Sequence, residues 1–150
     1  MVTGNGLALQ LKFFKAALQR HQGQPIIVMW HRPRFSSGLH GDAKNTDALW
    51  KLAAADRDVK VVLWGHDHNY EHRKFIYRNA DGSKRYLDTF VVGTGGAELR
   101  ACRVPSRAPS LLCGPNNFGV LKLQLTSESL TWSFIHTNDQ VKDLGVRNIT

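Results

Sequence analysis

Acidic side chains, cysteines and long apolar runs are all scarce in this chain of 150 residues. Its 12 Asp and Glu residues stand against 20 Lys and Arg residues, so the formal net charge is +8 at pH 7. Such an imbalance indicates either a solvated basic surface or an attraction to anionic substrates such as phosphate esters. No apolar run approaches the length of a transmembrane helix, and we therefore expect no membrane partner.

The sequence also lacks the features of several other protein classes. It has no nucleic-acid recognition module and no aromatic-basic stripe, so we expect no specific nucleic-acid partner. A nucleic-acid-binding domain that exploits the positive charge is the weakest alternative, and its affinity for DNA would depend steeply on salt. The first ten residues lack the basic and apolar regions of a signal peptide. A hydrophobic content of 42% and a charged content of 21% are typical of a single globular domain.

The two cysteines, Cys102 and Cys113, lie in one loop-like segment. If they are paired, they close a short loop and stabilise the fold by roughly 2–3 kcal/mol. The alternative is two unrelated thiols. We favour the disulfide, which indicates an oxidising compartment and hence a secreted or extracytoplasmic location.

The first half of the chain has the pattern of a β-α-β unit. Apolar residues at spacings of four and three predict a helix over about residues 7–22. The apolar run 25–30 predicts a strand buried on both faces. A second helix over about 46–56 and a strand over 59–64 follow. A right-handed crossover makes the two strands parallel, so their carboxyl ends meet at one edge of the sheet.

The second half is richer in β-hairpin patterns. Strands at 75–77 and 85–92 flank a turn centred on Asp81-Gly82. The glycines at 93–96 indicate a turn where backbones approach closely, and 97–116 should be a surface excursion. Strands over 118–125 and 129–136 follow. The tail after about Thr137 is polar, and the sequence determines its structure poorly.

Three histidines follow the two parallel strands directly. His31 comes after the first strand, and His66 and His68 come after the second. Because both strands end at the same edge, their imidazoles can converge, and neutral imidazole is the commonest protein ligand for transition metals. The pattern predicts a metal site, and the alternative is three unrelated buried or surface histidines.

Two motifs carry a resemblance to a known family. VMWH at 28–31 fits a V-x-x-H block, and GHDHNYE at 65–71 fits a G-H-x-H block that continues as H-x-Y-E. These blocks resemble the last two metal-binding blocks of the calcineurin-like metallophosphoesterases, and most closely those of the purple acid phosphatase branch. The likeness extends to SSG at 36–38, VGTGG at 92–96 and the strand at 118–123.

The resemblance implies an α/β fold, namely the C-terminal part of a two-sheet αββα sandwich, with a βαβ unit followed by β-hairpins. We expect a single domain over 1–150 with its core over about 7–136. The family's Asp-x-His, Gly-Asp and Gly-Asn-His blocks, which precede these motifs in the chain, are not found. The N-terminal half of the family domain is therefore expected to be absent.

The resemblance also implies ligand roles. His31 and His66 would bind one metal ion and His68 the other, so the complete protein would hold two Fe, Zn or Mn ions. His40 occupies the place of a catalytic histidine that contacts the phosphate or the leaving group.

Other residues of the second motif are expected to support these ligands. Asp67 matches a variable position and should be a second-shell or structural residue. Tyr70 and Glu71 should brace the loop. His72 stands where an arginine is expected.

The implied function is metal-dependent hydrolysis of phosphate esters, most simply of monoesters, by two-metal activation of water. The alternative is a catalytically silent fragment or a binding module that keeps the phosphoesterase scaffold. The expected partners are a phosphate-ester substrate and either the missing N-terminal half or a second copy that associates through an exposed sheet edge.

Overall fold

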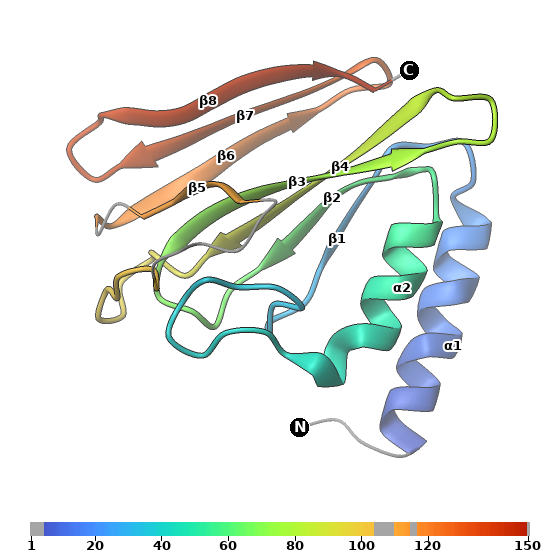
Figure 1. Cartoon of the computed structure of the whole chain (residues 1–150), viewed down its shortest axis with the longest axis horizontal. Coiled ribbons are helices and arrows are strands. Elements are labelled where there is room, and N and C mark those ends of the chain that lie inside the picture. The colour runs from blue at the N-terminus through green and yellow to red at the C-terminus, as the bar shows by residue number, and fades with distance from the viewer. Residues whose placement is uncertain (1–4, 104–109, 115–116, 150) are drawn as a thin grey trace.

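The computed structural model describes residues 5–103, 110–114 and 117–149. Two helices, a five-stranded mixed sheet and a three-stranded antiparallel sheet form three successive layers (Figure 1). The elements in chain order are α1 (Asn5–Arg20), β1 (Ile26–Met29), η1 (Lys44–Thr46), α2 (Asp47–Ala55), β2 (Val59–Trp64), β3 (Tyr70–Arg78), β4 (Lys84–Val92), β5 (Ser110–Cys113), β6 (Gly119–Leu125), β7 (Ser129–His136) and β8 (Val141–Asn148). The first sheet has the order β1-β2-β4-β3-β5 and the second β6-β7-β8. The predicted α/β class and the two-sheet arrangement are confirmed.

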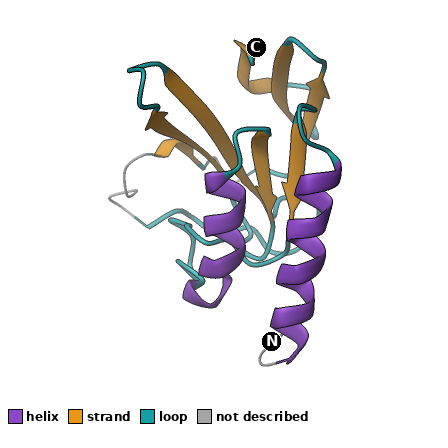
Figure 2. Cartoon of the chain, turned by 90° about the vertical axis from the view of Figure 1, so that its right-hand side faces the viewer, coloured by secondary structure: helices purple, strands orange, loops and turns teal. Residues whose placement is uncertain are grey.

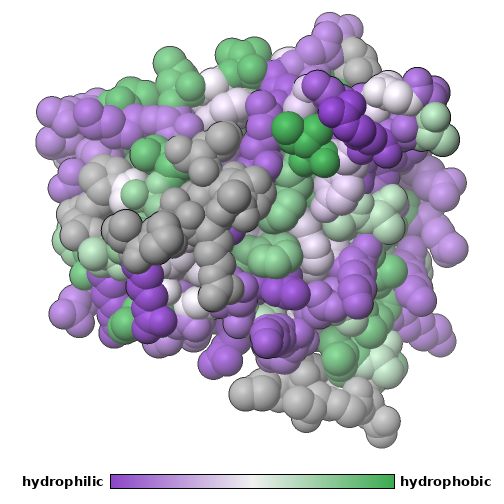
Figure 3. Space-filling view, viewed as in Figure 1, coloured by the Kyte–Doolittle hydropathy of each residue, from purple (hydrophilic) through white to green (hydrophobic). Residues whose placement is uncertain are grey.

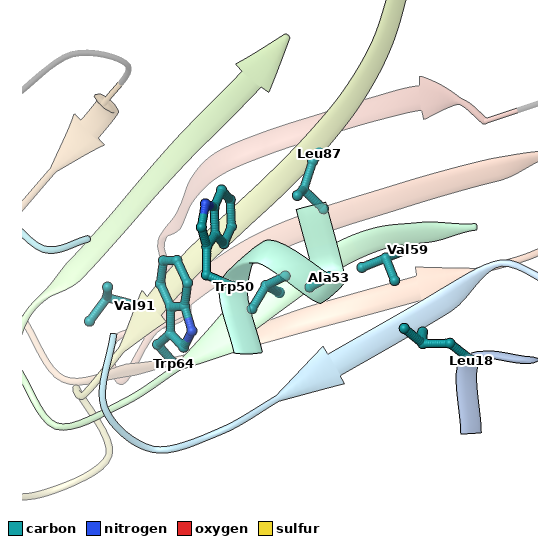
Figure 4. Packing of buried hydrophobic residues seen from close by; sticks show 8 residues of the cluster. Leu18, Trp50, Ala53, Val59, Trp64, Leu87 and Val91 are labelled. Carbon is teal, nitrogen blue, oxygen red and sulfur yellow. The ribbon is translucent and has the colours of Figure 1, made fainter. Parts of the chain in front are cut away.

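Both helices lie on the same face of the larger sheet (Figure 2). The apolar stripe of α1 turns towards this sheet, and Leu18 is its most buried member, with 7% of its surface exposed. Trp50 and Ala53 of α2 pack beside Trp64 of β2 and complete this core (Figure 4). The helices therefore fix the two strands that deliver the histidine motifs.

The predicted β-α-β unit is present, with β1 and β2 as parallel neighbours. Met29 pairs with Leu63, so the two strands end together at one edge of the sheet. The expectation that β1 is buried on both faces is wrong, because β1 is the edge strand of the described sheet and Met29 is 72% exposed.

The hairpin of β3 and β4 is longer than its sequence pattern indicates. Strand β3 begins at Tyr70, directly after the histidine motif, and pairs with β4 through to Arg78. At the end of β4, Gly93 lies so close to the backbone of Asp67 that a Cβ atom would stand 1.8 Å from the Asp67 carbonyl oxygen. The close approach predicted for this glycine turn is confirmed.

The polar segment after Thr137, for which the sequence predicted no element, contains a strand. Strand β8 forms the outer edge of the second sheet, and its inward-facing side chains are Asp143 and Arg147. Gly145 lies between them, where a Cβ atom would stand 2.1 Å from the Trp132 ring. The strand looks polar in sequence because it faces a buried polar group instead of an apolar core.

We call that group the inter-sheet polar cluster. It joins β3 and β4 of one sheet to β7 and β8 of the other and consists of Tyr70, His72, Asp88, Trp132, Asp143 and Arg147. His72 lies at its centre, 2.9 Å from Asp88 through Nε2 and 2.9 Å from Asp143 through Nδ1. Arg147 pairs with the second oxygen of Asp88.

Cys102 and Cys113 form a disulfide, as the sequence analysis favoured. It links the segment after the glycine turn to the end of β5, which pairs with β3. The rest of the predicted 97–116 excursion includes residues outside the described part of the chain.

The outer face of the second sheet carries apolar side chains, which are visible along β8 (Figure 3). Leu144 and Val146 are 74% and 72% exposed. Among the described residues, both helices lie on the other sheet, so no helix covers this face. No helix in the described part of the chain is both long and apolar enough to span a bilayer.

Candidate metal and phosphate site

The histidines that follow β1 and β2 line a cleft of about 460 Å³ at the edge of the sheet. Its walls come from both strand ends and from the glycine turn that follows β4. The lining residues are His31, His40, Gly65, His66, His68, Val92, Gly93, Gly95, Gly96 and Ala97. The structure therefore brings together the three predicted ligand histidines and His40.

His31 and His66 face each other across the end of the two parallel strands. His31 Nε2 lies 3.3 Å from His66 Nδ1, and Gly65 N donates a hydrogen bond to His31 O at 3.0 Å. Two nitrogens bound to one tetrahedral zinc ion at 2.0–2.1 Å lie roughly 3.3–3.4 Å apart. The observed spacing therefore fits either a shared metal ion or a direct hydrogen bond.

His66 has a left-handed backbone conformation, with φ at +67°. This conformation is uncommon for residues other than glycine, and strained residues of this kind cluster at functional sites. The left-handed residue that follows β2 is thus His66 and not Gly65. The strain aims the His66 ring at His31 and away from its own strand.

His68 has one ring nitrogen fixed and the other available. Its Nδ1 lies 2.8 Å from the carbonyl oxygen of Glu98, which can only accept a hydrogen bond. His68 Nδ1 therefore carries the proton and Nε2 keeps its lone pair. Metal-binding histidines commonly donate their second N–H to a backbone carbonyl in this way.

His40 reaches the cleft from the loop between β1 and α2, and Asp67 holds this loop. Asp67 Oδ1 accepts a hydrogen bond from His40 N at 2.8 Å, and Oδ2 accepts one from the Ser36 hydroxyl. Gly38 lets the loop wrap around this carboxylate, because a Cβ atom there would stand 2.4 Å from Asp67 Cγ. Asp67 is fully buried and its oxygens point into the loop, so it is not placed as a metal ligand.

Glu71 and Tyr70 point to opposite faces of β3. Glu71 accepts hydrogen bonds from Ser37 N at 2.7 Å and from the Ser37 hydroxyl at 2.9 Å, and it pairs with Arg73 at 2.8 Å. It therefore holds the same loop as Asp67. Tyr70 instead donates a hydrogen bond to Asp143 in the inter-sheet polar cluster. Burial and the Asp143 carboxylate raise the pKa of Tyr70, which keeps its hydroxyl protonated.

The electrostatics of the cleft favour neutral imidazoles and anionic ligands. Burial lowers the pKa of His66, and the nearby basic groups of His40, Arg32 and His31 lower it further. A neutral ring is the form that binds metals. None of the described residues that line the cleft is an aspartate or a glutamate.

A full metal centre is not assembled by the described residues, among which no group of three or more potential ligands is close enough to hold an ion. The donor set nevertheless fits part of such a centre. Two nitrogens stand at the spacing of a shared ion, and a third histidine has its ligand nitrogen available. The cation charge would need carboxylates from elsewhere.

A model of the calcineurin-like phosphoesterase family matches residues 2–70, which include both histidine motifs. This part of the chain is therefore similar to the calcineurin-like phosphoesterases. Members of this superfamily generally use binuclear metal centres. A sequence search of curated proteins finds no match to the chain.

Solved structures with the same fold include two of different character. GAP50, the anchor in the inner membrane complex of Plasmodium, superposes with a TM-score of 0.72 at 18% identity. The purple acid phosphatase PPD1 from yellow lupin seeds superposes with a TM-score of 0.68 at 22% identity. The matches cover 93% and 96% of this chain but only 42% and 28% of the two relatives. The chain thus spans less than half of either relative.

Two contributors to the cleft were not identified from the sequence. Ser36 was noted only as part of the family resemblance, although its hydroxyl binds Asp67. Arg100 places Nη1 3.1 Å from His40 Nε2. It lies 32 residues after His68 in a segment with no periodic pattern, so no local signal identifies it.

Proposed function

We propose that this chain supplies the histidine side of a binuclear centre that hydrolyses phosphate esters. The observation that carries the proposal is the 3.3 Å spacing between His31 Nε2 and His66 Nδ1 at the ends of adjacent parallel strands. The left-handed backbone of His66 supports it, because the fold tolerates an unfavourable conformation to hold that ring in place.

Each histidine then has a distinct role. His31 and His66 would hold one ion and His68 would hold a second, with Fe, Zn or Mn suited to mixed imidazole and carboxylate ligands. Bound ions of this kind lower the pKa of a water molecule and neutralise phosphoryl oxygens. His40 binds the phosphate or donates a proton to the leaving oxygen, and Asp67 sets its position through the His40 backbone N–H.

The carboxylate ligands would come from a second polypeptide segment, either an N-terminal half of the domain or a second copy of the chain. Strand β1 pairs only with β2 among the described residues, which leaves its other edge open. A groove of about 790 Å³ runs from this edge between the two sheets, and Met29, Leu63 and Val120 line it. A segment that adds a strand at β1 would fill the groove and reach the cleft.

We further propose a secreted or extracytoplasmic location. The disulfide between Cys102 and Cys113 supports it, because such links persist in oxidising compartments.

The test is metal content by elemental analysis, together with phosphatase activity, for the wild-type chain and His66→Ala. Tight Zn, Fe or Mn in the wild type and its loss in the variant would support a preformed half-site. Asp81→Ala in the β3–β4 turn is the matched control and should retain metal. Hydrolysis by the chain with its complementing half, abolished by His66→Ala, would support catalysis. No hydrolysis in that complete assembly would contradict it.

A second candidate is a catalytically silent scaffold that keeps the phosphoesterase fold. The similarity to GAP50, described as an anchor, and the absence of acidic residues among the described cleft residues favour it. The same assay distinguishes the two candidate functions. A scaffold would show neither hydrolysis nor dependence on His66 in the complete assembly.

A further inference from the structure

The segment that carries Arg100 is attached to both loops that bear the cleft histidines. Arg100 N donates a hydrogen bond to His68 O at 2.9 Å, while Glu98 O accepts the proton of His68 Nδ1 at 2.8 Å. Arg103 N donates to Ser37 O at 2.7 Å. These bonds fix the backbone on either side of Arg100 relative to the cleft.

The disulfide provides a covalent attachment for the same segment. Cys102 lies two residues after Arg100 and is bonded to Cys113 at the end of β5. The side-chain amide of Asn69 donates to both sulfurs, at 3.3 and 3.4 Å. Asn69 directly follows His68, so the disulfide joins the segment of Arg100 to the second histidine motif.

The guanidinium of Arg100 faces the cleft through His40. Its Nη1 lies 3.1 Å from His40 Nε2. An arginine can only donate, so Nε2 must be the acceptor and His40 is neutral at that atom. Among the described residues, no carboxylate forms an ion pair with Arg100. An arginine so placed beside a cleft without acidic lining residues is suited to bind an anion.

We infer that Arg100 is the residue that selects a terminal phosphate group, by donating hydrogen bonds to its nonbridging oxygens beside His40. This inference rests on the proposed function of the cleft as a phosphate-ester site. The planar guanidinium matches two phosphate oxygens at once. A monoester offers more charged oxygens than a diester, in which a second ester group replaces one of them. Arg100 therefore favours monoesters over diesters.

The test compares Arg100→Gln and Arg100→Lys with Arg78→Gln, which removes the same charge from an exposed site at the tip of the β3–β4 hairpin. Inorganic phosphate is the binding probe, measured by calorimetry on the full chain. We expect Arg100→Gln to weaken binding roughly 10- to 100-fold, as for loss of a charged hydrogen-bond donor. Arg100→Lys should lose less, and Arg78→Gln should change affinity less than about twofold.

Substrate kinetics on the complete, metal-loaded assembly give the second readout. In Arg100→Gln, kcat/KM for 4-nitrophenyl phosphate should fall by the same factor as phosphate affinity, and for bis(4-nitrophenyl) phosphate by less than about threefold. Equal losses on both substrates would overturn the inference while leaving the proposed function intact. If the wild type hydrolyses neither ester, the proposed function fails. The phosphate-binding measurement then tests the role of Arg100 by itself. That role is overturned if the wild type does not bind phosphate, or if Arg100→Gln binds phosphate as tightly as the wild type.

Discussion

The histidine at the centre of the molecule and the histidines at the cleft are in opposite situations. His72 is 1% exposed and has a carboxylate at each ring nitrogen. His31, His66 and His68 lie at the rim, where no lining residue among those described is acidic. The buried imidazole therefore has a charged partner near each ring nitrogen, whereas Nε2 of His68 at the rim has no hydrogen-bond partner among the described residues. Charged partners on both sides indicate a structural role, whereas a lone pair that is open to a cleft indicates a functional one.

The largest loss of stability is expected from a substitution in the inter-sheet polar cluster. Asp88→Asn removes the carboxylate that His72 and Arg147 share inside the protein. Removing one partner of a buried charge pair costs about 3–5 kcal/mol. Urea unfolding should show this loss, with phosphate affinity unchanged at concentrations where the variant is folded. A loss under about 1 kcal/mol would mean that the cluster is not an interacting unit.

Gly93→Ala tests how tightly the cleft is built. The new Cβ would collide with the Asp67 carbonyl, and overpacking of this kind costs about 1–3 kcal/mol or more. It should also displace the loop between His66 and His68 and weaken metal binding. Gly95→Ala is the control, because nothing lies within 4 Å of a Cβ atom there. Thermal melts and metal titrations of the pair should differ, and equal behaviour would contradict the close approach.

The inter-sheet polar cluster, unlike the cleft, should make the stability of the fold depend on acidic pH. Burial raises the pKa of Asp143, but hydrogen bonds from His72, Tyr70 and Trp132 outweigh it and lower the pKa overall. A lowered carboxyl pKa stabilises the fold above the ordinary value of about 3.9, and this contribution is lost as pH falls through the folded-state pKa. The stability difference between wild type and Asp143→Asn should be constant near neutral pH and shrink at acidic pH. A stability difference that grows as the pH falls would mean that folding raises the pKa of Asp143 instead of lowering it.

The smallest effect on stability is expected at the rim of the cleft, and there the substitution should stabilise the fold. His66→Gly relieves the left-handed backbone and should stabilise the fold by about 1 kcal/mol, although metal retention is lost. Unfolding curves and elemental analysis of the same sample measure both. His66→Ala is the matched control, since it removes the ring but keeps the strain. Destabilisation by His66→Gly would show that the ring is held for packing.

The sequence predicted the cleft well because its signals are local. Apolar runs ending in histidine motifs identified β1 and β2, and parallel pairing follows from the helix between them. Strand β8 was missed because its inward residues, Asp143 and Arg147, are polar and satisfied only by partners far away in the chain. The exposure of β1 was missed because burial depends on which strand lies beside it.

The link between Cys102 and Cys113 has a practical consequence for anyone who prepares this protein. A reducing cytosol or a thiol in the purification buffer opens the link beside Arg100, and the thiol also competes for transition metals. Such a sample can keep both sheets and still lack an ordered cleft. Reduction of the disulfide would then explain why such a preparation is inactive. The protein should therefore be refolded without reductant before any assay.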